Sequence, residues 1–222
     1  MTQVTVLPSE AVPHLETVWT VVVGGGSGQR FGKPKQYELI GDRRVIDYSK
    51  AIAEQMSAGV VVVVPPSDAA AEGAVAGGDS RSASVRAGLA VVPDDATIVC
   101  VHDAARPLAS PAVYERVIAA VAAGADAAVP GLPVADTIKV VEADGTVVAT
   151  PDRSTLVAVQ TPQAFRASVL RAAHAAGGDA TDDAALIELA GGNVVVVDGD
   201  HRNRKITLPD DLEWVRREMS EQ

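Results

Sequence analysis

The 222-residue chain has few aromatic and sulfur-containing residues. It contains two Trp, three Tyr and two Phe, so its core must be built mainly from the aliphatic side chains that make up most of its 47% hydrophobic residues. Cys100 is the only cysteine, which excludes an intrachain disulfide and is typical of a reducing compartment. Because Cys100 lies in the apolar run Thr97–Val101, we interpret it as a small core residue.

Positive charge is also scarce. The chain has 19 Lys and Arg against 29 Asp and Glu, a formal net charge of −10, and no segment gathers the basic stripe that a nucleic-acid partner requires. No apolar stretch approaches the length of a membrane span, and the amino terminus lacks the charged start and apolar core of a signal peptide. The composition therefore predicts a cytoplasmic protein that binds neither nucleic acid nor membrane.

The first positive charges follow a glycine-rich loop. Met1–Gln29 contains no Lys or Arg, yet Arg30, Lys33 and Lys35 come within the next six residues. The run Thr20–Val23 before the loop suits a strand buried on both faces. The loop itself contains Gly24, Gly25, Gly26 and Gly28. Since a net-acidic protein binds a triphosphate only by focusing positive charge locally, the stretch predicts a phosphate-binding loop; a turn whose glycines only save space is the alternative.

Spacing excludes the two best-known glycine loops. A dinucleotide fingerprint needs glycines at i, i+2 and i+5, but Gln29 or Phe31 occupies the last position, counted from the first or third glycine. A P-loop needs Gly, four residues and then Gly-Lys-Ser/Thr, but Ser27 and Pro34 occupy its ends. An NAD-binding oxidoreductase is therefore disfavoured.

Strand and helix patterns alternate along the chain. Helices are expected at Val45–Met56, Ser82–Val91, Pro111–Ala122, Arg166–Ala176, Asp182–Ala190 and from Pro209 onward, and strands at Val21–Val23, Val60–Val64, Thr97–Val101, Ala127–Pro130, Leu156–Gln160 and Asn193–Val197. This alternation is typical of an α/β fold with a mostly parallel, twisted sheet that binds ligands at its carboxyl edge. We expect one domain over residues 1–222.

The alternation breaks at Asp136. Thr137–Val141 and Val147–Thr150 are β-type runs joined through Asp144-Gly145, a strong hairpin signal. A lone hairpin is marginally stable in water unless it packs on something. Residues 136–153 therefore predict a protruding β-arm that docks on another subunit, with a plain edge hairpin as the alternative.

Two polar motifs follow expected strands. Gly77–Ser84 leads into a helix and could hold a ribose or a pyrimidine edge, unless it is only a capped helix with a glycine turn. In Val101–Pro107, Asp103 stands where a strand ends and could hold Mg²⁺ against nucleotide phosphates. The alternatives are a helix cap for Asp103 and a structural ion pair for Arg106. We interpret His102 as a packed histidine and not as a catalyst.

Hydroxyl groups and cations recur later in the chain. They lie in Asp136–Lys139, Pro151–Arg153, Gln160–Phe165, Thr181–Asp183 and Arg204–Thr207. Such groups suit a small phosphorylated polyol, because a guanidinium matches a phosphate and threonines satisfy hydroxyls. Taken singly, each has a structural alternative: a β-former for Thr137, a surface charge for Arg153, a turn residue for Thr161, a helix N-cap for Thr181 and a solvated cation for Lys205.

Together these motifs resemble a known family. Gly26-x-Gly28-x-Arg30 followed by Pro34-Lys35-Gln36 resembles the nucleotide loop of sugar and polyol-phosphate nucleotidyltransferases. His-Asp-Ala-Ala-Arg-Pro, Asp-Thr-Ile-Lys, Gln-Thr-Pro-Gln, Thr-Asp-Asp-Ala and Lys-Ile-Thr narrow the match to the 2-C-methyl-D-erythritol 4-phosphate cytidylyltransferases. The resemblance extends from Val21 to Leu212.

The resemblance implies a Rossmann-like, three-layer homodimer that transfers CMP from CTP to 2-C-methyl-D-erythritol 4-phosphate with Mg²⁺ and releases pyrophosphate, in the non-mevalonate isoprenoid pathway. It places Arg30, Lys35 and Lys205 around the triphosphate as catalytic residues. The nucleotide-binding residues that it implies are Gly24, Gly25, Gly26, Ser27, Gly28, Gly78, Asp79, Arg81 and Ser84. It makes Asp103 a metal ligand and assigns Asp103, Arg106, Thr137, Arg153, Thr161 and Thr181 to the substrate side. The arm brings Thr137 and Arg153 to the neighbour's site.

Three departures from the family pattern stand out. Val23-Gly24-Gly25 replaces a common Pro-Ala-Ala, which predicts a looser loop that orders with CTP. Only four residues separate Arg30 from Lys35, which makes Lys33 a candidate stand-in, and Arg204 replaces a usually apolar neighbour of Lys205. Two related activities remain alternatives: a ribitol-5-phosphate cytidylyltransferase, and a regulatory protein that binds CTP without turnover.

Overall fold

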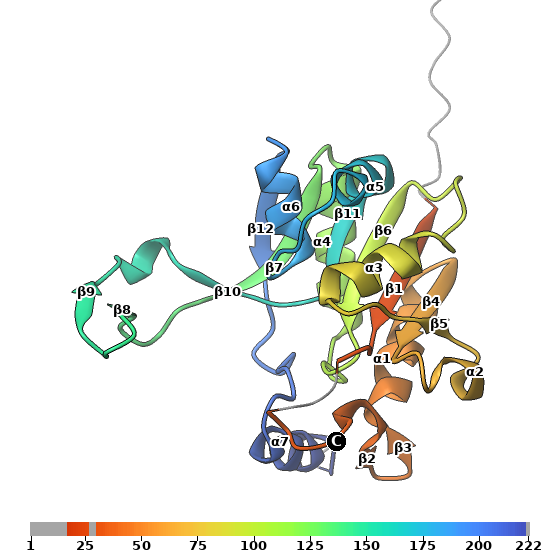
Figure 1. Cartoon of the computed structure of the whole chain (residues 1–222), viewed down its shortest axis with the longest axis horizontal. Coiled ribbons are helices and arrows are strands. Elements are labelled where there is room, and N and C mark those ends of the chain that lie inside the picture. Colours follow the sequence, from red (N-terminus) through yellow and green to blue (C-terminus); the bar gives the residue numbers. More distant parts are fainter. Residues whose placement is uncertain (1–16, 27–29, 221–222) are drawn as a thin grey trace, which may run out of the picture.

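The computed structural model describes residues 17–26 and 30–220 of the chain. In that part, one large sheet lies between two layers of helices, and a thin arm projects away from it (Figure 1). Along the sheet the strands follow the order β10-β7-β11-β6-β1-β4-β5, and β12 pairs with β7. Their bounds are β1 (Val18–Val23), β4 (Gly59–Val64), β5 (Val75–Ala76), β6 (Ile98–Asp103), β7 (Ala127–Pro133), β10 (Val157–Val159), β11 (Gln163–Arg166) and β12 (Val194–Asp198).

The sheet is mostly parallel, as predicted. Strand β1 pairs in parallel with β4 and β6, β4 with β5, and β7 with β12. Strands β10 and β11 run antiparallel to their neighbours. The sequence pattern did not predict β11 as a strand, because its four residues Gln163–Arg166 begin and end in polar side chains and were interpreted as part of a binding motif.

The helices cover both faces of the sheet. Their bounds are α1 (Val45–Met56), α2 (Ala69–Glu72), α3 (Arg81–Leu89), α4 (Pro111–Ala122), α5 (Ala167–Ala175), α6 (Asp183–Leu189) and α7 (Pro209–Ser220), with short 3₁₀ helices η1 (Lys35–Tyr37) and η2 (Arg153–Thr155). Helices α3, α5 and α6 pack on one face and α1 and α4 on the other. The predicted bounds of α1 and α4 are confirmed, and α7 begins at Pro209 as expected.

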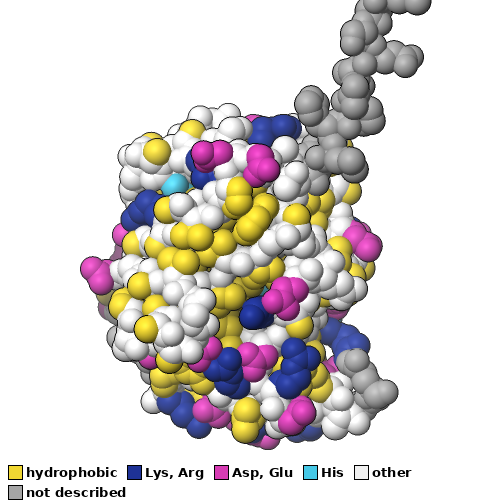
Figure 2. Space-filling model, turned by 90° about the vertical axis from the view of Figure 1, so that its right-hand side faces the viewer, with side chains coloured by type: hydrophobic (Ala, Val, Ile, Leu, Met, Phe, Trp, Pro, Cys, Tyr) yellow, Lys and Arg dark blue, Asp and Glu magenta, His cyan; other side chains and the backbone are white. Residues whose placement is uncertain are grey.

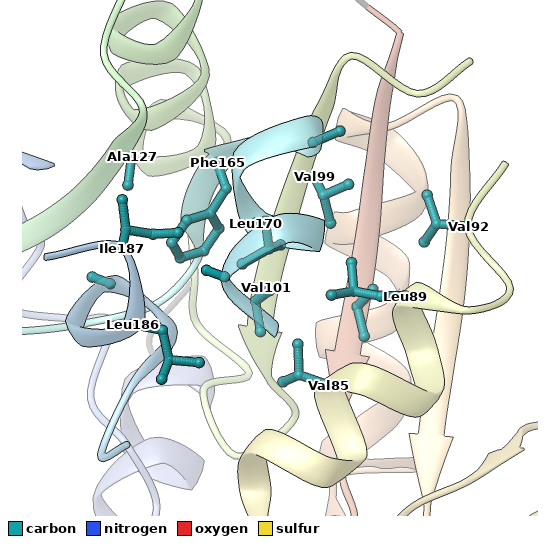
Figure 3. Packing of buried hydrophobic residues seen from close by; sticks show 14 of the residues in the cluster. Val85, Leu89, Val92, Val99, Val101, Ala127, Phe165, Leu170, Leu186 and Ile187 are labelled. Carbon is teal, nitrogen blue, oxygen red and sulfur yellow. The ribbon is translucent and has the colours of Figure 1, made fainter. Parts of the chain in front are cut away.

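The core is built from aliphatic side chains around a few large residues. Figure 3 shows Phe165 of β11 packed between Leu170 of α5 and Ile187 of α6. All three side chains are fully buried. On the other face, Tyr114 of α4 and Cys100 of β6 are buried in a second cluster, so the interpretation of Cys100 as a core residue is confirmed.

The carboxyl ends of the central strands meet at one edge. Val23 at the end of β1 lies in register with Val63 and Asp103 on the neighbouring strands. Below this edge, α7 and a small hairpin of β2 (Leu39–Ile40) and β3 (Arg43–Arg44) enclose a third apolar cluster, which includes Phe31 and Ile206. These two residues anchor the segments that carry Arg30, Lys35 and Lys205. The fold therefore brings the first loop and the end of the chain to the same edge.

The arm leaves the sheet between β7 and β10 (Figure 1). Its strands β8 (Val140–Val141) and β9 (Val147–Ala149) form an antiparallel pair, shorter than the predicted runs. The side chains of both strands are exposed, and Val141 retains 56% of its accessible surface. A protruding β-arm is thus confirmed. In the described residues, no helix is long and apolar enough to cross a membrane.

Candidate active site

A cavity of about 590 Å³ opens at the carboxyl edge of the sheet. It collects residues from the glycine loop, the segment after it, the start of α3, the end of β6 and the segment before α7. Its walls include Gly24, Gly25, Gly26, Arg30, Lys35, Gln36, Gly78, Asp79, Arg81, Ser84, Asp103 and Lys205. The three residues predicted as catalytic therefore share one cavity with most of the residues predicted to bind the nucleotide. Ser27 and Gly28 lie outside the described residues.

The glycines serve partly to save space. The N–H of Gly24 donates to Val63 O at 2.7 Å, and a Cβ on Gly24 would lie 3.1 Å from Ile46 Cδ1. A Cβ on Gly25 would lie 3.1 Å from Ser84 Oγ. At Gly26, no atom of the described residues would meet an added Cβ within 4 Å. Close packing explains the first two glycines, while Gly26 leaves room beside its backbone for a ligand.

Three cations crowd into the cavity. Lys35 lies on η1, and Lys205 is held beside the sheet because Ile206 N donates to Ala105 O at 2.8 Å. Burial lowers the pKa of Lys35, and the nearby charges of Lys205 and Arg30 lower it further. Like charges held this close repel one another, so the cavity favours an anionic ligand. Figure 2 shows one face of the molecule, on which Lys and Arg side chains are interspersed with acidic ones.

The structure separates Lys35 from its neighbour Lys33. The ammonium of Lys33 pairs with Glu38 at 2.7 Å, its side chain is 60% exposed, and it does not line the cavity. Lys33 is therefore a poor stand-in for Lys35. Arg204 also points elsewhere: it pairs with Asp211 at 2.8 Å and lies over the Trp214 ring.

Asp103 is the acidic centre of the cavity. It ends β6, only 7% of its surface is exposed, and its Oδ2 accepts a hydrogen bond from Lys205 Nζ at 2.6 Å. Its Oδ1 lies 3.4 Å from Arg81 Nε. Burial alone would raise the pKa of Asp103, but Lys205 and Arg81 hold that pKa well below its usual range. The carboxylate is therefore ionised, and it ends a strand instead of capping a helix.

This carboxylate fits a magnesium ion that arrives with a nucleotide. Among the described residues, no group of three or more His, Cys, Asp or Glu side chains could hold a metal ion by itself. Mg²⁺ needs only one or two protein carboxylates when phosphates and water supply its other ligands. The ionised oxygens of Asp103, which retain free lone pairs, meet this requirement.

The loop before α3 is shaped by its serines. Ser80 caps α3 by accepting a hydrogen bond from Ala83 N at 3.1 Å, and Ser84 Oγ accepts one from Gly78 N at 3.2 Å. A Cβ on Gly78 would lie 2.6 Å from Ala83 Cβ, so only glycine fits there. The helix cap and the tight turn are both present, and they place Asp79 and Arg81 on the cavity wall.

Two buried donors of the cavity lining have no partner within the described part of the chain. They are Nη2 of Arg81 and Nε2 of Gln36. Both atoms have almost no accessible surface, so they lie behind the cavity wall and do not themselves indicate where a ligand binds. Gln36 was not among the predicted site residues, although it ends the Pro34-Lys35-Gln36 motif that indicated the loop.

Two predicted substrate residues are instead engaged inside the protein. Arg106 donates to Asn203 O at 2.8 Å and to Val159 O at 3.4 Å, so its contacts within the chain are structural, and its assignment to the substrate stays a prediction. Thr161 is buried, and its Oγ1 accepts a hydrogen bond from Asp103 N at 2.9 Å. The same hydroxyl contacts His102 Nδ1 at 3.2 Å, and burial lowers the pKa of His102 to about 4. His102 is thus a packed, neutral histidine, as predicted.

The remaining predicted residues lie away from the cavity. Thr137 and Arg153 are exposed on the arm, where Arg153 Nη1 donates to Ala135 O at 2.7 Å. Thr181 is exposed before α6, whose N-cap is Asp182, so the structural alternative of Thr181 as the cap is excluded. Within one chain, the cavity lining therefore unites the described nucleotide residues, but of the residues predicted on the substrate side it includes only Asp103.

Comparison with known proteins decides the family. The model of the IspD family, 2-C-methyl-D-erythritol 4-phosphate cytidylyltransferase, matches residues 18–220. The chain belongs to this family. It is therefore an enzyme of the nucleotidyltransferase class, and an oxidoreductase is excluded.

Individual relatives agree with this assignment. The 2-C-methyl-D-erythritol 4-phosphate cytidylyltransferase of Nocardia farcinica is 44% identical over 214 residues, which cover 88% of this chain and 91% of the relative. A bifunctional IspD/IspF enzyme of Anaeromyxobacter dehalogenans is 45% identical over 90% of this chain, which spans 56% of that longer protein. Among solved structures, the cytidylyltransferase of Thermus thermophilus is 34% identical, covers 90% of this chain and 98% of its own, and superposes with a TM-score of 0.77.

Proposed function

We propose that this cytidylyltransferase moves the CMP unit of CTP onto 2-C-methyl-D-erythritol 4-phosphate, releasing pyrophosphate, in the isoprenoid precursor pathway. Family membership supports both the nucleotide and the acceptor. The observation that carries the proposal within the molecule is the crowding of Arg30, Lys35 and Lys205 around one cavity beside Asp103. Repulsion among three cations held this close destabilises the empty cavity, and a bound polyanion would remove that repulsion.

The chemistry requires no nucleophilic side chain. A phosphate oxygen of the acceptor forms a bond to the α-phosphorus of CTP, and the bond from that phosphorus to the bridging oxygen of pyrophosphate breaks. The attacking oxygen is already ionised, so no general base is needed. His102 and Cys100 could not take such a role, because both are fully buried and burial raises the pKa of Cys100 to about 12. Catalysis then depends on positioning and charge stabilisation.

Four charged residues of the cavity have a part in this scheme. Arg30 and Lys35 would bind the charge that grows on the α-phosphate and on the leaving pyrophosphate, and Lys205 would bind the phosphate chain beside Asp103. Asp103 would hold Mg²⁺, which when bound neutralises phosphate charge. The cytidine would lie against the turn at Gly78, which also lines the cavity.

The arm supports a homodimer in which each chain completes the other's site. Its strands are short, exposed and apolar, with Val140, Val141, Val147 and Val148 each at least 45% exposed. An isolated hairpin of this kind is stable only when it packs on a partner. In this proposal Thr137 and Arg153 contact the acceptor bound to the neighbouring chain. The cytoplasmic location remains a prediction from composition.

Mixing two inactive variants tests this exchange. Arg30→Ala removes a residue of a chain's own cavity, whereas Arg153→Ala removes a residue offered to the neighbour. A mixed dimer then contains one intact site, so an equimolar, re-equilibrated mixture should recover about one quarter of wild-type turnover under random pairing. A mixture as inactive as either variant alone would contradict the proposed exchange.

A pyrophosphate-release panel tests the reaction itself. CTP, UTP and ATP are each combined with 2-C-methyl-D-erythritol 4-phosphate and with ribitol 5-phosphate. We expect rapid release only with CTP and the methylerythritol substrate. Faster release with ribitol 5-phosphate would favour the ribitol-5-phosphate cytidylyltransferase, and CTP binding without release with either acceptor would favour the regulatory protein.

A further inference from the structure

A chain of buried charges leads away from the cavity. The guanidinium of Arg81 lies between two carboxylates, with Nη1 at 2.6 Å from Asp183 Oδ2 and Nε at 3.4 Å from Asp103 Oδ1. The other oxygen of Asp183 contacts His174 Nε2 at 3.0 Å. Asp183 has no exposed surface and His174 is 4% exposed. Asp183 does not line the cavity, and among the described residues Arg81 joins it to the cavity wall.

Three helix ends hold this arrangement in place. Arg81 is the first residue of α3, Asp183 is the first residue of α6, and His174 lies in the last turn of α5. A carboxylate in the first turn of a helix is stabilised by the unpaired N–H groups there. The contact with His174 thus fixes the Asp183 carboxylate from α5 as it pairs with Arg81.

The distances indicate which carboxylate fixes the position of the Arg81 guanidinium. The contact of Arg81 with Asp183 is a short charge-assisted hydrogen bond, whereas the contact with Asp103 is longer by 0.8 Å. Without Asp183, Arg81 would be free to move onto Asp103 and form the two-point pairing that guanidinium and carboxylate groups favour. That pairing would occupy the oxygens of Asp103 that Lys205 and a metal ion use.

We propose that Asp183, oriented by His174, is a positioning residue that holds Arg81 away from full pairing with Asp103 and so keeps the Asp103 carboxylate available to the bound nucleotide. The expected change in kcat/KM rests on the proposed function. The expected change in the position of Arg81 does not. It gives a role to an acidic residue that neither contacts the cavity nor could be assigned one from the sequence.

The first test is Asp183→Asn, which keeps the shape of the side chain and removes its charge. We expect kcat/KM for CTP to fall about 10- to 100-fold, the usual effect of losing a residue that orients a ligand-binding group. Asp47→Asn is the matched control, because Asp47 also lies in the first turn of a helix, pairs with Arg44 at 2.8 Å and is not among the cavity-lining residues. The control should retain turnover within about twofold, as expected for a partly exposed ion pair.

A double-mutant cycle separates positioning from a general structural effect. If Asp183 acts only through Arg81, Asp183→Asn should add no more than about a threefold loss in an Arg81→Met background. A full, multiplicative loss in that background would overturn the proposal, and so would wild-type kcat/KM for Asp183→Asn alone. Should that variant fail to fold, His174→Gln and His174→Phe replace it. Gln can still donate to Asp183 and should preserve turnover, whereas Phe cannot and should reduce it. Equal turnover of the two variants would count against the proposal.

A crystal structure of Asp183→Asn gives a readout that does not depend on activity. We expect Arg81 to turn toward Asp103, with Nε and Oδ1 closer than the 3.4 Å seen here. An unmoved Arg81 would overturn the inference. If the wild-type protein released no pyrophosphate, only the proposed function would fail, and this structural comparison would still decide the role of Asp183.

Discussion

Replacing Arg30 or Lys35 with alanine should reduce kcat for cytidylyl transfer by about 10²- to 10³-fold, the usual cost of losing one donor that stabilises transition-state charge. Both residues line the cavity, and neither has an ion-pair partner among the described residues. Their charge is therefore available to the phosphates. Pyrophosphate release at saturating CTP and acceptor measures the effect on kcat alone.

Lys33→Ala is the matched control for this prediction. It removes the same charge two residues before Lys35, but Lys33 is exposed and paired with Glu38. Exposed ion pairs contribute little, so turnover should stay within about twofold of wild type. Near-wild-type rates in both Arg30→Ala and Lys35→Ala would refute the proposed charge stabilisation. An equal loss in Lys33→Ala would show that the rate depends on the net charge of this segment and not on contacts within the cavity.

The Lys35→Ala variant should lose activity without losing stability. Burial, Lys205 and Arg30 all lower the pKa of Lys35, so its charged form is less stable in the folded protein than in the unfolded one. Removing that charge should therefore leave the free energy of unfolding unchanged or raise it near neutral pH, while activity falls. Such opposition between stability and activity is common where a site holds charges ready for a ligand.

Much of the fold could be predicted because local sequence agrees with it. Valine runs gave the central parallel strands, and helical spacing gave α1 and α4 to the residue. Strand β11 could not be predicted, because four residues covered on both faces show no alternation of polar and apolar side chains. Its place between β6 and β7 depends on the order of the whole sheet, which local patterns do not encode.

The site was predictable in its residue types but not in its pairings. Clustered cations beside glycines indicated the phosphate-binding loop, and the end of a buried strand indicated Asp103. The pairs Lys205–Asp103 and Arg81–Asp183 each join residues 102 positions apart, so only the folded sheet brings them together. The contact of Arg106 with Asn203 O could not be predicted for the same reason, since the two residues lie 97 positions apart.

Asp103→Asn should reduce kcat/KM by at least about 10²-fold, because metal-assisted charge neutralisation at phosphates contributes several kcal/mol. The amide keeps the shape of the side chain but is a poorer ligand for Mg²⁺ and no longer balances Lys205. Turnover measured across a Mg²⁺ titration should show a weaker dependence on the metal than in the wild type. Asp126→Asn, on a partly exposed carboxylate outside the cavity lining, should leave the titration unchanged.

The cost in stability should be much smaller than this loss of activity. Breaking a buried ion pair usually costs about 3–5 kcal/mol, because the remaining charge stays buried and unpaired. Here the side chain of Lys205 is 37% exposed and can be hydrated, and Arg81 keeps Asp183 as its partner. We therefore expect a decrease in the free energy of unfolding well below 3 kcal/mol by denaturant titration. A larger decrease together with an unchanged Mg²⁺ dependence would show that Asp103 holds the fold together and does not serve the phosphates.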